Sequence, residues 1–259
     1  MIVVKVGGAQ GIDMENVVRD LVAYRDNMVL VHGCSHELDM LQKNLGIQPR
    51  MVTSVSGYQS RYTDRQTLEL FMMVCSGKIN KMIVEQCQQY GLNAIGISGV
   101  DGRLLEGKKK GILKILEDGK KKILRGDFTG IVEKVNVNLL SLLLNNGYLP
   151  VVAPLAVSYD QYAINVDGDR AAAAIAGALH AEVLIILSNV PGLLDLKTNT
   201  LIEKISKEEC MQYAQGRMMK KILGAKEALA AGVDKVILSS ANISHPISSA
   251  LQGAGTMIL

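Results

Sequence analysis

The sequence predicts an α/β protein, a three-layer αβα sandwich around a central, mainly parallel sheet. Short aliphatic runs alternate with amphipathic stretches along all 259 residues, which is typical of a parallel sheet with helices on both faces. Two segments break this pattern, near residues 51–63 and 111–125, and both are predicted to be inserted β-hairpins. The length suits one large domain or two small ones.

The strands are predicted from β-type aliphatic runs, at residues 2–6, 28–32, 94–98, 149–153, 183–187, 236–239 and 256–259. The helices are predicted from amphipathic spacing, at 13–25, 36–45, 64–90, 168–179 and 218–231. Within the second hairpin, Asp118-Gly119 stands between two aliphatic runs, which is a strong turn signal. In the first hairpin, Gly57 marks the turn.

Composition excludes several classes of protein. The longest apolar runs are far too short to cross a bilayer, and the first residues lack the features of a signal peptide. The four cysteines have no paired spacing, so we expect free thiols in a reducing compartment and a cytoplasmic protein. Residues 32–36 hold two histidines and a cysteine, but no further ligands follow at zinc spacing, so no metal site is predicted. A net charge of +3 is too small to indicate nucleic-acid binding.

Two segments could bind an anion. Lys5 stands near the end of the first strand, just before Gly7-Gly8. Free backbone N–H groups beside an ammonium suit a phosphate, but a buried strand whose lysine reaches solvent past a tight turn fits equally well. After the second strand, Gly33-Cys34-Ser35 leads into a helix whose N-terminus could attract an anion, although Ser35 could simply be its N-cap.

Three further segments carry groups suited to carboxylates or phosphates. Arg61 lies in an arm of the first hairpin, where it could bind a carboxylate bidentately or pair with a neighbour. Asn165, Asp167 and Asp169 precede a helix, either as caps or as part of a phosphoryl-transfer site. Residues 216–221 begin another helix with three cations, an unfavourable start that suggests a nearby anion.

Together these motifs resemble the amino acid kinase family, and within it the N-acetylglutamate kinase branch. The matching stretches follow the family order along nearly the whole chain, at residues 5–8, 31–33, 60–64, 96–102, 165–169, 187–192, 216–221 and 255–257. The resemblance implies a carbamate kinase-like fold with two lobes. Residues 1–160 would bind the amino-acid substrate and pair two chains into a homodimer, and residues 161–259 would bind ATP.

The resemblance also assigns roles to single residues. Lys5 and Lys221 would flank the transferred phosphoryl group as catalytic residues, with Asp169 ordering them and Lys220 as the alternative to Lys221. The substrate would be held by Gly8, Gly33, Cys34, Ser35, Arg61 and Asn165. ATP, with Mg²⁺ held by its phosphates, would contact Lys5, Gly7, Gly8, Ser188, Asn189, Gly192, Met218 and Lys221. Where the wider family has a run of glycines, this chain has Gly33-Cys34-Ser35, so positive φ is less accessible there.

Three features resemble a subgroup that phosphorylates aminoadipate or glutamate attached to an acidic amino-group carrier protein: residues 57–61, residues 125–130 and Asn189. The product would be an acyl phosphate, and no general base is needed because a side-chain carboxylate is ionised near pH 7. Eight basic residues of the second hairpin would then dock the acidic carrier electrostatically. They are Lys108, Lys109, Lys110, Lys114, Lys120, Lys121, Lys122 and Arg125.

Two other functions fit the same sequence. One is a kinase that acts on free N-acetylglutamate, and the other is a non-catalytic regulatory or nucleic-acid-binding protein that uses the lysine-rich hairpin. Aminoadipate and glutamate differ by one methylene, which is worth only about 1–3 kcal/mol of discrimination. No residue distinguishes them. The carrier-linked reaction, without nucleic acid or membrane as a partner, is the function we predict.

Overall fold

The computed structural model describes residues 1–117 and 119–259. Its largest sheet has the strand order β12-β14-β13-β11-β1-β2-β8-β5. These strands are β1 (Ile2–Val6), β2 (Met28–His32), β5 (Ala94–Ser98), β8 (Leu149–Ala153), β11 (Val183–Ser188), β12 (Lys204–Ile205), β13 (Lys235–Ser240) and β14 (Thr256–Ile258). The pairs from β13 to β5 are parallel, and only the pairing of β14 with β13 is antiparallel. The predicted, mainly parallel sheet is confirmed.

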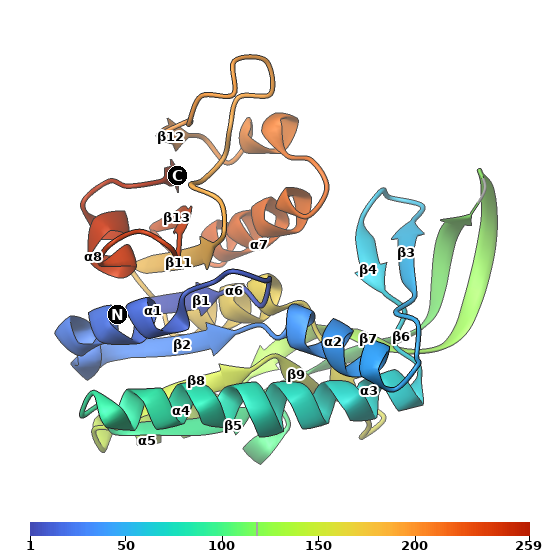
Figure 1. Ribbon diagram of the computed structural model, residues 1–259, viewed down its shortest axis with the longest axis horizontal. Coiled ribbons are helices and arrows are strands. Elements are labelled where there is room, and N and C mark those ends of the chain that lie inside the picture. Colours follow the sequence, from blue (N-terminus) through green and yellow to red (C-terminus); the bar gives the residue numbers. More distant parts are fainter. Residues whose placement is uncertain (118) are drawn as a thin grey trace.

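Helices cover both faces of this sheet (Figure 1). One face carries α1 (Met14–Leu21), α4 (Asn80–Gln89) and α8 (Pro246–Leu251), and the other carries α5 (Val137–Asn145), α6 (Gly168–Ala178) and α7 (Met218–Ala230). Neighbouring residues of one strand, such as Val3 and Val4, belong to different cores, because successive side chains point to opposite faces. The predicted three-layer αβα sandwich is therefore confirmed.

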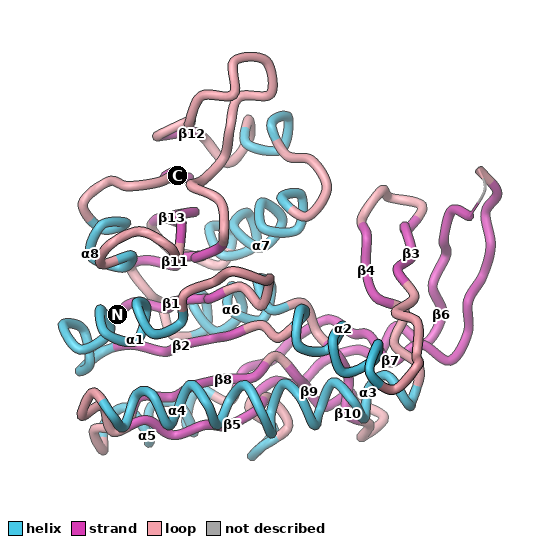
Figure 2. The backbone as a smooth tube through the Cα atoms, viewed as in Figure 1, coloured by secondary structure: helices cyan, strands magenta, loops and turns pink. Residues whose placement is uncertain are grey.

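Both predicted hairpins are present and belong to one second sheet, in the order β4-β3-β6-β7-β10-β9. Its strands are β3 (Met51–Ser54), β4 (Gln59–Arg61), β6 (Leu105–Glu117), β7 (Lys120–Val135), β9 (Leu155–Ser158) and β10 (Ala163–Asn165). Figure 2 shows the two hairpins projecting together from one end of the sandwich. Because β6 also pairs with β9, strands β6, β7, β10 and β9 close on themselves.

The second hairpin is longer than predicted. Its ladder extends back to Leu105 and Val135, with register shifts next to Gly107 and Gly111. Each glycine has its own reason: a Cβ at Gly107 would collide with the carbonyl oxygen of Ile131, and Gly111 has φ +63°, which favours glycine. Asp118 of the predicted turn lies outside the described residues.

The predicted helix 64–90 is one continuous rod made of α3 (Arg65–Phe71), a π-helical segment (Met72–Ile79) and α4. Asp64 is its N-cap, accepting a hydrogen bond from the backbone N–H of Thr67 at 2.8 Å. The predicted helix 13–25 is shorter as an α-helix, because a 3-10 segment (Val22–Asn27) follows α1. Short 3-10 turns also cover Asp101–Arg103 and Cys210–Tyr213.

Besides these 3-10 turns, two α-helices and three strands of the described residues had no counterpart in the prediction: α5, α8, β9, β10 as a paired strand, and β12. All are short, at most nine residues, and brief apolar runs do not separate helix from strand. In the part of the chain that the structure describes, no helix combines the length and the apolar character needed to cross a lipid bilayer.

Candidate active site

The centre of the site is a buried carboxylate between two lysines. Lys5 lies near the carboxyl end of β1, while Asp169 and Lys221 lie in the first turns of α6 and α7. Lys5 Nζ is 2.6 Å from Asp169 Oδ1, and Lys221 Nζ is 3.5 Å from Asp169 Oδ2. The exposed fractions of the three side chains are 8%, 14% and 9% for Lys5, Lys221 and Asp169. Three segments far apart in the sequence thus place two ammonium groups around one anion.

Burial and the mutual interactions of Lys5, Asp169 and Lys221 determine the pKa values of this group. Burial alone would raise the pKa of Asp169, but Lys5 and Lys221 outweigh it and hold that pKa well below its ordinary value. Burial lowers the pKa of Lys221, and repulsion from Lys5 lowers it further, while Asp169 opposes both. Two cations share one carboxylate, so the group keeps an excess of positive charge, which suits the stabilisation of a phosphoryl group in transfer.

The lowered pKa of Lys221 predicts an alkaline limb in the pH profile of turnover. Only the protonated ammonium neutralises negative charge, and a lowered pKa means that the proton is lost at a lower pH than in an ordinary lysine, near 10.4. Asp169→Asn removes the anion that stabilises the protonated form, so the limb should move to lower pH. We expect kcat measured between about pH 6 and 10 to show this shift. A limb that stays in place or moves to higher pH would contradict this assignment.

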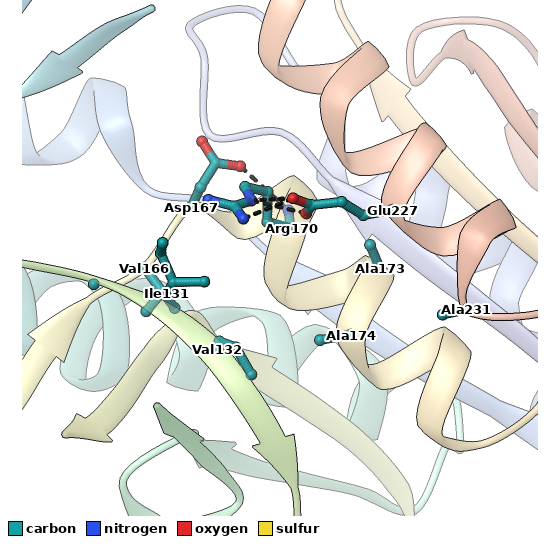
Figure 3. Close-up of a pocket in the computed structure, with 10 residues that line it drawn as sticks. Ile131, Val132, Val166, Asp167, Arg170, Ala173, Ala174, Glu227 and Ala231 are labelled. Atoms are coloured by element: carbon teal, nitrogen blue, oxygen red, sulfur yellow. Dashed lines mark hydrogen bonds and ion pairs between the residues drawn. The ribbon is translucent and has the colours of Figure 1, made fainter. Parts of the chain in front are cut away.

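The packing of α6 against α7 sets this geometry. A Cβ at Gly224 would lie 3.1 Å from the backbone of Asp169, so glycine lets the two helices approach closely. Arg170 and Glu227 join the same helices through three hydrogen bonds of 2.6–3.0 Å. Figure 3 shows this pair beside a cavity of about 190 Å³ between β7, α6 and α7. Sequence patterns did not single out Gly224 or this pair, because both act only through the packing of two helices.

The geometry distinguishes the two neighbouring lysines of α7. Lys220 Nζ lies 3.4 Å from Asp167 Oδ2, whereas Lys221 shares Asp169 with Lys5. Asp167 is also the N-cap of α6, accepting hydrogen bonds from the backbone N–H groups of Asp169 and Arg170. Two of the three unfavourable cations at the start of α7, Lys220 and Lys221, are therefore offset by carboxylates of this chain.

The glycine loops after β1 and β2 pack directly on each other. A Cβ at Gly8 would collide with the backbone nitrogen of Cys34, and a Cβ at Gly33 would lie 2.6 Å from Gly8 N. Cys34 has φ −149°, so the side chains that replace the family's glycines need no positive φ. The N-cap of α2 (Ser35–Asn44) is Cys34, so the alternative reading of Ser35 as the N-cap is wrong. The Ser35 hydroxyl instead donates to the carbonyl oxygen of Gly8 at 2.9 Å.

A buried histidine, His32, supports this loop, a role that the sequence did not predict. Complete burial lowers the pKa of His32 to about 4, so the ring is neutral. Its Nε2 lies 3.1 Å from Asn80 Nδ2, and its Nδ1 lies 3.4 Å from the carbonyl oxygen of Gly33. Because an amide Nδ2 only donates, Nε2 must accept, which leaves the proton on Nδ1. Within the described residues, no group of three or more His, Cys, Asp or Glu side chains could hold a metal ion.

Two of the predicted substrate residues, Arg61 and Asn165, lie outside the glycine loops. Arg61 of β4 donates to Gln42 Oε1 at 2.7 Å and also pairs with Asp39, both on α2. Asn165, at the end of β10, donates through Nδ2 to the Thr63 hydroxyl at 3.0 Å. Helix α2 therefore begins at the glycine loop that follows β2 and also orients Arg61.

The residues expected to contact ATP gather at the carboxyl ends of the strands beside Lys5. Ser188 ends β11, Asn189 follows it, and Met218 begins α7. Gly7 donates its N–H to the carbonyl oxygen of Leu187 at 2.9 Å, which joins the first glycine loop to this edge. Gly192 has φ +157° and packs against Thr256, where a Cβ would lie 2.6 Å from the hydroxyl oxygen. In open α/β sheets, ligands bind at this edge.

The basic residues of the second hairpin fall into two groups. Lys122 pairs with Glu117 at 2.5 Å, Lys108 pairs with Glu133 at 2.9 Å, and Lys109 Nζ lies 3.5 Å from the ring centre of Phe128. Lys110 is exposed, yet partial burial and the nearby Arg170 and Lys220 lower its pKa. Lys108, Lys109 and Lys122 are therefore engaged by the protein itself, whereas Lys110 lies near two other cations.

Three others form what we call the basic–aliphatic face. In the β6–β7 register, Ile112 faces Arg125, Lys114 faces Ile123, and Leu116 faces Lys121, and such pairs share one side of the ribbon. All six side chains are exposed. Among residues 1–117 and 119–259, none of these three cations has an ion-pair partner. Lys120 is also exposed but faces Glu117 on the opposite side.

Comparison with known proteins shows the family. The model of the amino acid kinase family matches residues 1–240. This chain belongs to the amino acid kinase family. A member named [LysW]-aminoadipate kinase, from Deinococcus radiodurans, is 54% identical over an alignment covering this whole chain and 91% of that protein. A Thermus thermophilus protein of the same name is 48% identical, with both chains fully covered. A [LysW]-aminoadipate/[LysW]-glutamate kinase from Metallosphaera sedula is 39% identical, again with full coverage of both.

Solved structures of related kinases and synthases have the same fold. The N-acetylglutamate synthase of Neisseria gonorrhoeae, complexed with coenzyme A and N-acetyl-glutamate, has a TM-score of 0.79 at 25% identity; 99% of this chain is covered, and it spans 58% of that longer protein. The carbamate kinase of Giardia lamblia has a TM-score of 0.66 at 15% identity, covering 100% and 97% of the two chains. The predicted carbamate kinase-like fold is confirmed.

Proposed function

We propose that this amino acid kinase transfers the γ-phosphoryl group of ATP to the side-chain carboxylate of aminoadipate, or of glutamate, attached to an acidic amino-group carrier protein. The names of its full-length relatives from Deinococcus, Thermus and Metallosphaera support this substrate. The observation that carries the proposal is the sharing of buried Asp169 by Lys5 and Lys221. The product is an acyl phosphate for the biosynthesis of lysine, or of arginine where glutamate is the substrate.

In this proposal the substrate carboxylate attacks the γ-phosphorus of ATP in line, and ADP leaves. The carboxylate is already ionised at neutral pH, so no side chain has to remove a proton. Lys5 and Lys221 neutralise the charge that spreads over the transferred group, and Asp169 holds both ammonium groups in place. Arg61 binds the free α-carboxylate of the substrate, while Asn165 and the backbone around Gly8 and Gly33 orient the amide and the reacting group.

ATP enters as its magnesium complex, with the metal held by the nucleotide phosphates. The donor set of this chain supports that assignment, because the carboxylates of Asp167 and Asp169 are occupied by Lys220, Lys5 and Lys221. We assign the C-terminal lobe, residues 161–259, to the nucleotide, along Ser188, Asn189, Gly192 and Met218. The N-terminal lobe, residues 1–160, is assigned to the amino acid and its carrier.

The basic–aliphatic face is the surface that we assign to the carrier. Its three unpaired cations would attract an acidic protein, and the exposed Ile112, Leu116 and Ile123 would add apolar contact once it is docked. Lys108 and Lys122 already pair with Glu133 and Glu117, so they would attract the carrier less strongly. A freely soluble small substrate would need no such face, which favours the carrier over free N-acetylglutamate.

The acyl phosphate can be tested directly. Incubation with ATP, carrier-linked aminoadipate and hydroxylamine should convert the product to a hydroxamate on the carrier, because hydroxylamine attacks the activated carbonyl carbon and releases phosphate. Mass spectrometry of the intact carrier should show a gain of about 15 Da. ADP formation without hydroxamate would mean that phosphate is not transferred to the carboxylate. Formation of neither would favour a non-catalytic, regulatory or nucleic-acid-binding protein.

We propose that two chains pair through their N-terminal lobes and that the enzyme works in the cytoplasm, where ATP is supplied. Met40 of α2, Met73 of the π-helical segment and Met82 of α4 are exposed and would be covered by such pairing. Sedimentation velocity should then give about twice the mass of one chain, and a monomer at micromolar concentration would contradict the pairing.

A further inference from the structure

Asp127 is a buried carboxylate for which the proposed mechanism has no use. It belongs to residues 125–130, which resemble the carrier-dependent subgroup, and its exposed fraction is 0%. A charged group is buried at high cost unless it is well hydrogen-bonded. At Asp127 the bonds are present: Oδ1 accepts from the Thr63 backbone N–H at 3.1 Å, and Oδ2 accepts from the backbone N–H of Thr129, also at 3.1 Å, and from its hydroxyl.

These bonds lead to the residues that hold the substrate. Thr63 is fully buried, and its hydroxyl donates to the carbonyl oxygen of Arg61 at 3.2 Å while accepting from Asn165 Nδ2 at 3.0 Å. The backbone N–H of Phe128 donates to the carbonyl oxygen of Thr63 at 2.7 Å. One carboxylate thus fixes the loop between β4 and α3 against β7, with Arg61 on one side of Thr63 and Asn165 on the other.

We propose that Asp127 is a positioning residue for the amino-acid substrate. It acts through Thr63, which fixes the backbone position of Arg61 and the side-chain rotamer of Asn165. Asp127 itself touches neither substrate nor nucleotide. This inference rests on the proposed roles of Arg61 and Asn165. Displacement of a substrate-holding group by about 1 Å can cost up to a hundredfold in rate, so a residue behind that group has a measurable effect.

Asp127→Asn keeps the shape and removes one acceptor. The two carboxylate oxygens each accept from a backbone N–H, whereas an amide must turn its own NH₂ group toward one of them, which leaves that donor unsatisfied. The loop between β4 and α3, which Asp127 holds through Thr63, should therefore shift. The KM for the amino-acid substrate is expected to rise by about tenfold or more. The KM for ATP should change by less than about twofold, because the hydrogen bonds of Asp127 go to Thr63 and Thr129 and not to residues of β11 or α7.

Asp20 offers a matched control. It is also buried, with an exposed fraction of 3%, and it also accepts three hydrogen bonds, from the backbone N–H groups of Ile247 and Ser248 and from the Ser248 hydroxyl, at 2.7–2.8 Å. Those bonds stabilise the first turn of α8, which lies with α1 and α4 on one face of the main sheet, away from Asp127. In Asp20→Asn the remaining carbonyl oxygen can still accept from both N–H groups, because both bind the same oxygen of Asp20, so its melting temperature should fall less than that of Asp127→Asn. The KM for either substrate should not change.

The outcomes separate positioning from simple structural support. A selective rise in KM for the amino-acid substrate in Asp127→Asn, absent from Asp20→Asn, supports the inference. An unchanged KM, an equal rise for ATP, or the same rise in Asp20→Asn would overturn it. If Asp127→Asn does not fold, Thr129→Val and Thr129→Ser replace it, because the Thr129 hydroxyl donates to Asp127 Oδ2. The valine variant removes the hydroxyl and should raise the KM, the serine variant should restore it, and equal behaviour of the two would count against the inference.

Failure of the proposed function would look different. If the wild-type enzyme does not turn over carrier-linked substrate, the proposed function is wrong. The KM comparison is then made with free N-acetylglutamate, whose α-carboxylate and amide are suited to the same two residues. The effect of Asp127 is expected there too, and its absence would overturn the inference independently.

Discussion

Lys5→Ala is expected to lower kcat by about three orders of magnitude, because a fixed cation aimed at developing charge contributes about 10²–10³-fold or more. Stability should fall far less. Removal of one partner normally leaves a buried charge uncompensated, but here Lys221 remains 3.5 Å from Asp169. We expect a loss of about 1–2 kcal/mol, which for a chain of this size lowers the melting temperature by roughly 2–8 °C.

Lys220→Ala is the control for this experiment. Lys220 lies next to Lys221 in the chain and also pairs with a carboxylate, that of Asp167. If proximity to the site were sufficient, its loss would resemble that of Lys5. We expect less than a tenfold change in kcat, measured by coupled ADP release, together with thermal melts of each variant. A Lys5→Ala enzyme that keeps a tenth of wild-type turnover would show that Lys5 is structural.

Lys114→Glu combined with Lys121→Glu should weaken the carrier selectively. Both lysines are exposed on the basic–aliphatic face without an ion-pair partner in the described part of the chain. Reversing two charges turns attraction of an acidic carrier into repulsion, and we expect kcat/KM for the carrier-linked substrate to fall roughly 30-fold or more at low salt. The wild-type value should fall with rising salt, and the variant should be much less sensitive.

Two controls keep this result specific to the hairpin. Lys204→Glu combined with Lys207→Glu makes the same change in net charge at exposed positions of the C-terminal half and should leave the carrier unaffected. Turnover of a carrier-free acetylated analogue should be equal in all three enzymes. Loss of activity on both substrates in the hairpin variant would mean that the hairpin supports the fold or the active site instead of docking a partner.

The sequence predicted the parts of the molecule whose signals are local. The strands of the main sheet except β12, the hairpin turn at Gly57 and the helix at residues 168–179 follow from residue type and spacing. Lys5, Asp169 and Lys221 follow from motifs at strand ends and helix starts. Their meeting on one carboxylate could be expected only from resemblance. Nothing in the spacing of residues 5, 169 and 221 specifies a distance of 2.6 or 3.5 Å.

The parts that escaped prediction depend on tertiary contacts. Gly224 looks like a weak point in a helix, yet it is the place where α7 approaches Asp169. Asp127 looks like one more exposed charge near a lysine-rich hairpin, but the closing of β6, β7, β10 and β9 buries it. Likewise, the eight basic residues look alike in the sequence, and only the register of the ribbon separates the paired cations from the unpaired ones.

The most direct test compares kcat/KM for aminoadipate and glutamate linked to the carrier with kcat/KM for the same amino acids acetylated and free. Docking energy that is available only to the carrier-linked form should favour it by at least about a hundredfold. We therefore predict efficient turnover of one or both carrier-linked amino acids and slow turnover of both free ones. Equal or better use of free N-acetylglutamate would contradict the assignment and identify a kinase of the small molecule.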